Sequence, residues 1–133
     1  MHTWHDYHLT GFAVDGAQEK ITFNVSWPLP AGPEPRSAVV VFSGVAGYFF
    51  EHDLGTNIIL SLDEESLQNF LVEHADQFNR EAKWGWPLFW QGTTEQTFEH
   101  LSARGVRCYE LSSSYGLTGW VLAKSFEHRE AGA

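Results

Sequence analysis

The chain has 133 residues, with 8 Lys plus Arg against 17 Asp plus Glu, so its formal net charge is −9 when histidine is neutral. Such a charge repels phosphate backbones and anionic lipid surfaces, which argues against nucleic-acid and membrane partners and leaves a basic protein as one candidate partner. A chain of this length corresponds to one domain, and we expect a single globular domain over residues 1–133.

Only one cysteine is present, Cys108, which excludes an intramolecular disulfide and a multi-cysteine metal site. The N-terminal stretch MHTWHDYHLT lacks the basic region and the apolar core of a secretory signal. No stretch reaches the about 18 consecutive apolar residues that a membrane-spanning helix needs. We therefore expect a cytoplasmic protein, and the sequence indicates no cofactor.

The first predicted elements are two strands, residues 7–14 and 20–27, joined by a turn at Asp15-Gly16. Apolar and polar residues alternate in the second strand, so one of its faces is apolar. The proline-rich residues 28–35 cannot enter the interior of a sheet, and they predict a surface loop or a docking ligand for an SH3-like domain. We favour the loop because the segment is short and joins two strands.

Residues 38–62 hold the densest β-branched and aromatic content, which predicts the centre of an antiparallel sheet. Residues 39–42 are apolar throughout, as in a strand covered on both faces. Residues 48–53 pass from aromatic to charged, and a turn precedes the next strand at 58–60. The sequence leaves open whether residues 39–53 form one bent strand or two.

Next, the apolar period changes from two to about three and a half, which predicts two helices. The first has Ser61 or Asp63 as its cap and ends at Gly85; the second has Thr93 or Thr94 as its cap and ends at Gly105. Their inward residues are Leu67, Phe70, Leu71, Ala75, Phe78 and Ala82 in the first helix, and Phe98 and Leu101 in the second.

The last third predicts a strand at 106–111, a turn or bulge at 112–116 and a strand at 117–126 that closes the sheet. From about residue 128 the polar composition predicts a disordered tail. The fold class is therefore α+β: a mainly antiparallel sheet, strongly bent or partly barrel-like, with one long and one short helix packed on it.

Candidate chemical groups are few. His2, His5 and His8 could ligate a metal, but on an extended strand His5 points away from the other two, so we assign no metal site. Glu51 and Asp53 share a strand face and could act as an acid–base or metal-binding pair, or simply end a solvated strand. No nucleophile elbow is present, Cys108 has the character of a buried structural thiol, and we assign no catalytic residue.

Aromatic residues are abundant: six Trp, ten Phe and four Tyr. Trp84, Trp86 and Trp90 crowd the connector between the two predicted helices. Large rings fill cores, but the indole N–H also favours positions at a pocket or an interface. We predict that these three tryptophans, together with Glu51 and Asp53, form an acidic, aromatic-rimmed binding surface.

Two runs carry a resemblance to known proteins: residues 44–59, with Tyr48-Phe49-Phe50-Glu51-His52-Asp53 at the centre, and residues 110–121. In texture and length they resemble small uncharacterised bacterial proteins, among which are immunity-type partners of secreted toxins. The resemblance implies a bacterial protein-binding role and defines no functional residue.

Three functions from different classes follow. The leading one is a non-enzymatic protein-binding module whose partner is another protein, a basic one being one option, or a second copy in a homodimer. The first alternative is a small-ligand binder with an aromatic-lined pocket. The second is a metal-dependent hydrolase that uses His52 or the N-terminal histidines with Glu51 and Asp53.

Overall fold

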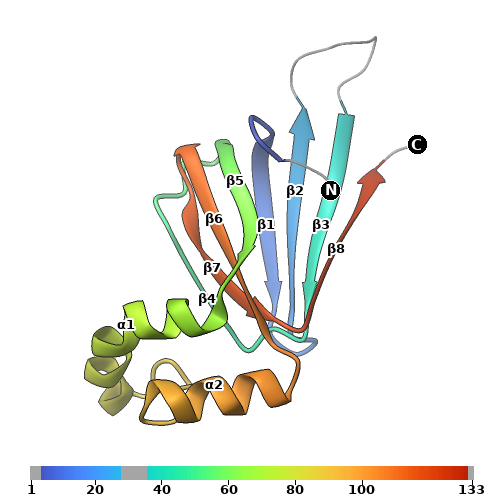
Figure 1. Cartoon of the computed structure of the whole chain (residues 1–133). Helices are drawn as coiled ribbons and strands as arrows, with labels where there is room; N and C mark the ends of the chain where they lie inside the picture. The colour runs from blue at the N-terminus through green and yellow to red at the C-terminus, as the bar shows by residue number, and fades with distance from the viewer. Residues whose placement is uncertain (1–3, 28–35, 132–133) are drawn as a thin grey trace.

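The computed structural model describes residues 4–27 and 36–131, which form an α+β fold (Figure 1). All eight strands join one antiparallel sheet that is not closed, in the order β4-β7-β6-β5-β1-β2-β3-β8. The strands are β1 (His8–Asp15), β2 (Lys20–Trp27), β3 (Arg36–Ser43), β4 (Gly47–Glu51), β5 (Asn57–Glu65), β6 (Arg107–Tyr115), β7 (Thr118–Ala123) and β8 (Ser125–Ala131). The helices are α1 (Leu67–Glu81), the 3-10 turn η1 (Ala82–Trp84) and α2 (Thr94–Ala103). The predicted fold class is confirmed.

The sheet is bent so strongly that its two ends meet at one corner. The short links from β3 to β4 and from β7 to β8 each join strands near opposite edges of the sheet. At this corner the Lys124 amide donates to the Ser43 carbonyl oxygen at 3.0 Å, and the Ala46 amide donates to the Leu122 carbonyl oxygen at 2.8 Å. Figure 1 shows β7 and β8 diverging from this point.

The bend encloses one core on the inner face of the sheet. Phe23 of β2 lies with its ring centroid 5.3 Å from that of Phe42 of β3, which in turn lies 5.5 Å from Tyr109 of β6. These rings come from strands that are far apart in the strand order, so the curvature brings them together. The alternation predicted for the second strand is confirmed, because Ile21, Phe23 and Val25 are all buried.

A second core lies between the helices and the outer face of the sheet. Trp120 of β7 is at its centre, with ring centroids 5.0 Å from Phe70 and 5.9 Å from Phe78, both on α1. Cys108 and Leu122 are fully buried on the same face. The helices therefore cover the outer face of β6 and β7, close to the edge of the sheet that β4 forms.

Helix α1 begins later than predicted. β5 continues to Glu65, so neither Ser61 nor Asp63 caps the helix; instead the Ser66 hydroxyl accepts a hydrogen bond from the Asn69 amide at 3.1 Å. The prediction failed because Asp63 to Glu65 pair with β6, and tertiary pairing overrides the preference of acidic residues for a helix start. For α2, Thr93 is the cap.

Both predicted stop glycines take the left-handed backbone that ends a helical segment, with φ 81° at Gly85 and φ 77° at Gly105.

Two further predictions about strands are wrong, and a third is confirmed in part. Of the turn or bulge predicted at 112–116, the turn is wrong, because β6 runs to Tyr115 and pairs with β5 as far as Ile58. The irregularity is confirmed, because the register of this pairing shifts between Ser113 and Tyr115. The proposed strand 117–126 divides at Lys124 into β7 and β8. The proposed tail is ordered as far as Ala131, because residues 125–131 pair with β3.

Residues 39–53, for which the sequence left open one bent strand or two, contain two strands, β3 and β4. The proline-rich residues 28–35 lie outside the described part of the chain.

Within the described residues, no helix is both long and apolar enough to cross a membrane.

Candidate protein-binding surface

The connector between α1 and α2 is held against the outer face of the sheet by aromatic contacts. Trp86 is half-buried, with its ring centroid 5.6 Å from Phe78 and 6.2 Å from Trp120. Phe89 is buried against Gly47 of β4, where a Cβ atom would overlap the ring. The predicted aromatic connector is therefore fixed next to strand β4.

Trp90 has a mainly structural position. Its Nε1–H donates to the Asn79 side-chain oxygen at 2.8 Å, and its ring lies 5.6 Å from that of Phe78. Because the ring packs on α1 and its polar atom already has a partner, Trp90 supports the connector and offers little to a binding partner.

Trp84, in contrast to Trp90, is largely exposed to solvent. The residue is 79% exposed, and the Lys83 ammonium lies 5.5 Å from the centre of its ring. An exposed indole of this size is unusual in a folded domain and is typical of a residue that becomes buried on binding.

Strand β4 adds two exposed aromatic residues that the sequence analysis did not select. Tyr48 is 40% exposed and lies against Phe50, and Phe49 is 37% exposed and lies 6.2 Å from Trp86 on the opposite face. β4 is the last strand of the sheet and pairs only with β7 among the described strands. We call Tyr48, Phe49, Trp84 and Trp86 the β4 edge surface.

One sequence signal could have identified β4. In Tyr48-Phe49-Phe50 three large rings stand in a row, so at least one must point away from the inner core. A fully buried strand would also carry aromatic residues on both faces, so this signal becomes decisive only once β4 is known to lie at the edge of the sheet.

The two predicted acidic residues have different roles. Glu51 ends β4 and is exposed beside the β4 edge surface. The Asp53 carboxylate accepts hydrogen bonds from the Asn57 side chain at 3.0 Å and the Gly55 amide at 2.9 Å, and both bonds lower its pKa. Asp53 therefore holds the turn before β5, whereas the exposed Glu51 lies next to the β4 edge surface.

A second acidic group, missed from the sequence, lies on the outer face beside α1. Burial raises the pKa of Glu110, the Glu65 and Glu73 carboxylates raise it further, and His74 opposes them. These residues come from β6, β5 and α1, so their proximity depends on the fold. In the described part of the chain, no group of three or more His, Cys, Asp and Glu residues could hold a metal ion.

Of the histidines considered as metal ligands or catalytic groups, the three that the structure describes, His5, His8 and His52, do not form a cluster. The Nδ1 atom of His5 lies 3.1 Å from the Leu60 carbonyl oxygen, and its Nε2 atom lies 3.5 Å from Asp6. His8 belongs to β1, His52 is exposed in the turn after β4, and His2 lies outside the described residues.

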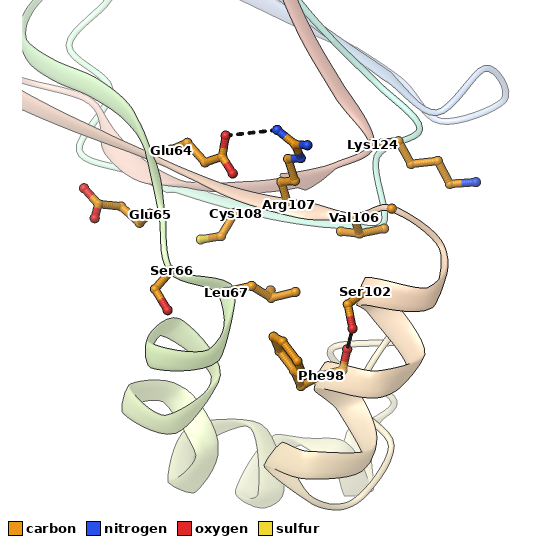
Figure 2. A pocket seen from close by; sticks show the side chains of 11 residues that line it. Glu64, Glu65, Ser66, Leu67, Phe98, Ser102, Val106, Arg107, Cys108 and Lys124 are labelled. Atoms are coloured by element: carbon orange, nitrogen blue, oxygen red, sulfur yellow. Dashed lines mark hydrogen bonds and ion pairs between the residues drawn. The ribbon is translucent and has the colours of Figure 1, made fainter.

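A groove of about 440 Å³ lies between the start of α1 and the end of α2. Figure 2 shows the side chains that line it. Leu67 and Phe98 line its sides, the Arg107–Glu64 ion pair (3.4 Å) lies on its rim, and Lys124 extends away from it. Burial and the nearby carboxylates raise the pKa of the Cys108 thiol far above its usual value, so the thiol stays protonated and is a poor nucleophile.

A larger recess of about 640 Å³ is lined by residues of β5, β6 and β8. Its aromatic lining includes Tyr109 and Phe126, whose rings stack at 5.3 Å, and Trp4. The Glu64–Arg107 pair also lines it.

Comparisons with protein-family models, with curated proteins and with solved structures find no match to this chain. The fold and the surface therefore define only a class: an α+β protein with an exposed aromatic edge on its sheet.

Proposed function

We propose that this chain is a non-enzymatic protein-binding module that holds a partner at the β4 edge surface. The observation that supports the proposal most is an edge strand, Tyr48-Phe49-Phe50, that carries large rings and no charge. Its Phe49 contacts Trp86, and the 79% exposed Trp84 lies two residues before Trp86 in the chain. Edge strands present unpaired N–H and C=O groups, which a strand from another chain can satisfy.

The other edge of the sheet gives an internal comparison. β8 carries Glu127, His128, Arg129 and Glu130, all exposed, and charged side chains are a common means of preventing unwanted strand pairing. β4 has one charged residue, Glu51, at its very end. The contrast supports β4 as the edge that accepts a partner.

The side chains around β4 suit a protein interface. Trp and Tyr are the residue types that most often dominate binding energy, and burial of Trp84 removes a large apolar area from water. For a basic partner, Glu51 and the net charge of −9 would also accelerate association.

Co-purification from the cells that produce the protein tests this proposal. Tagged wild-type chain, produced together with an untagged copy, should retain a protein partner, either the untagged copy or another protein, and this partner should be lost with Trp84→Ala and with Tyr48→Lys. Val72→Ala is the matched control, because Val72 is 60% exposed on α1 and is not part of the β4 edge surface. The proposal fails if neither the untagged copy nor another protein is retained, or if the Trp84 and Tyr48 variants retain the partner as well as the control does.

The recess lined by β5, β6 and β8 favours a second candidate, the binding of a small ligand. Its volume of about 640 Å³ and its aromatic lining are typical of ligand sites. Native mass spectrometry of untagged protein tests this candidate: an added small mass that disappears on denaturation would support it, and the bare mass of the chain would count against it.

A further inference from the structure

We infer that the occupant of the β4 edge is the β4 strand of a second copy of this chain, paired antiparallel about a two-fold axis through Phe49. This inference rests on the proposed function and deepens it by naming the partner. Such pairing would join two eight-stranded sheets into one.

The sequence of β4 suits pairing with itself. When two five-residue strands run antiparallel, the one register that pairs all five residues places Phe49 opposite Phe49 of the second copy and Tyr48 opposite Phe50. Glu51 then faces Gly47, so the only charged residue of the strand never faces itself. Like charges directly opposite one another would destabilise the pair, and this register avoids them.

Pairing also adds aromatic contacts on the outer face of the sheet near β4. Phe49 already lies 6.2 Å from Trp86 and 6.3 Å from Trp120 in its own chain. The two-fold axis brings the Phe49–Trp86 pairs of the two copies together, and the exposed part of each Phe49 ring finds an apolar neighbour. Aromatic pairs across strands contribute beyond the area that they bury.

β4 is held in place before any partner arrives. A Cβ atom at Gly119 of β7 would overlap the Phe49 carbonyl oxygen, so the two strands are in unusually close contact. On the outer face, Phe89 packs on Gly47. A strand fixed in this way loses little conformational freedom on pairing, which favours association.

The dependence of binding on salt concentration distinguishes a second copy of this chain from a basic protein as the occupant of the β4 edge. Two copies with a net charge of −9 each repel one another, so added salt should strengthen self-association by screening. Salt should weaken the binding of a basic protein, for which the charges attract.

Sedimentation equilibrium of the wild-type chain and of two charge variants tests the inference. The wild-type protein should be a dimer. Phe49→Lys and Phe49→Glu should each be monomeric, with dimer dissociation constants raised about 30-fold or more, the effect of losing a central aromatic contact. An equimolar mixture of the two variants should form dimers again, because in this register residue 49 faces only residue 49.

Two further variants keep the test decisive. Tyr48→Lys places a charge opposite Phe50 without disturbing the contacts of Phe49 with Trp120, and it should also be monomeric. Val72→Lys adds the same charge on α1 and should remain a dimer. Circular dichroism checks that each variant is folded.

The inference is overturned if the wild-type chain is monomeric at every concentration, if the single variants remain dimers, or if the mixture stays monomeric. If the wild-type chain is monomeric, the co-purification experiment still tests the proposed function. A different protein that is retained by the wild type but not by Trp84→Ala would leave the proposed function intact. If no partner is retained either, both fail.

Discussion

Asn57 joins three parts of the chain although it is a polar residue in the core, with only 1% of its surface exposed. Its side-chain oxygen accepts from the Leu54 amide at 3.0 Å and the Leu117 amide at 2.8 Å. Its side-chain nitrogen donates to the Leu9 carbonyl oxygen at 3.2 Å and to Asp53 at 3.0 Å. All the hydrogen-bonding capacity of the amide is therefore used, which makes its burial favourable.

Replacement of this residue should be costly. Asn57→Leu leaves two backbone N–H groups without their acceptor, and we expect it to lower the free energy of unfolding by about 2–4 kcal/mol. Chemical denaturation measures the change. Asn79→Ala, which removes one hydrogen bond to Trp90 at an exposed site, is the matched control and should cost about 1 kcal/mol or less. Equal losses in the two variants would contradict the role given to Asn57.

Glu110 should affect stability in a pH-dependent way. Its pKa is raised above 4.5 by burial and by Glu65 and Glu73, so the ionised form is less favourable in the folded state than in the unfolded state. The resulting loss of stability is absent below pH 4.5 and develops as the pH rises through the folded-state pKa.

Glu110→Gln should therefore stabilise the protein at pH 7 and have a smaller effect at pH 4. Thermal unfolding of the two proteins across this range measures the difference. In a background that carries Glu73→Gln the gain at pH 7 should shrink, because one of the repelling carboxylates is gone. A gain that does not change with pH would show that the effect is not due to ionisation.

Strands β4 and β7 depend on a close approach of their backbones that only glycine permits at position 119. The Gly119 backbone does not have positive φ, so the restriction comes from space alone. The same strand carries Trp120, on which the helices pack. Strand β7 thus positions the second core through Trp120 and the strand proposed to bind a partner through Gly119.

Gly119→Ala should loosen β4 from β7. We expect faster amide exchange in β4 and a loss of about 1–3 kcal/mol of unfolding free energy, the cost of forcing an extra methyl group into a packed site. Gly11→Ala in β1 is the control, since a Cβ atom there meets nothing within 4 Å. Unchanged exchange in β4 would mean that the close contact with Gly119 does not hold the strand.

Local patterns predicted much of the architecture. The alternation of Ile21, Phe23 and Val25 predicted a strand with one buried face, and the helical spacing of Phe70 and Phe78 predicted the long helix, because both patterns follow directly from backbone geometry. Residues 127–131 were not predicted as a strand, since their polar side chains give no apolar face and only β3 supplies their pairing. Strand order depends on such distant pairings, which one sequence does not record.

The candidate site was predicted only in part, because the exposure of a side chain, like strand order, depends on contacts between distant parts of the chain. Trp84 was selected from composition and is the most exposed aromatic ring of the described residues. Trp90 was selected by the same argument but packs on α1, because composition does not distinguish a core ring from a surface ring. Phe49 was missed because its exposure follows from the place of β4 at the edge of the sheet.

The measurement that tests the β4 edge most directly is hydrogen–deuterium exchange of the wild-type chain at increasing protein concentration. If β4 pairs with β4 of a second copy, its amides should become protected as the concentration rises, while those of β8, at the other edge of the sheet, should not change. Protection of β8 instead of β4, or of neither edge, would contradict pairing of this chain with itself through β4.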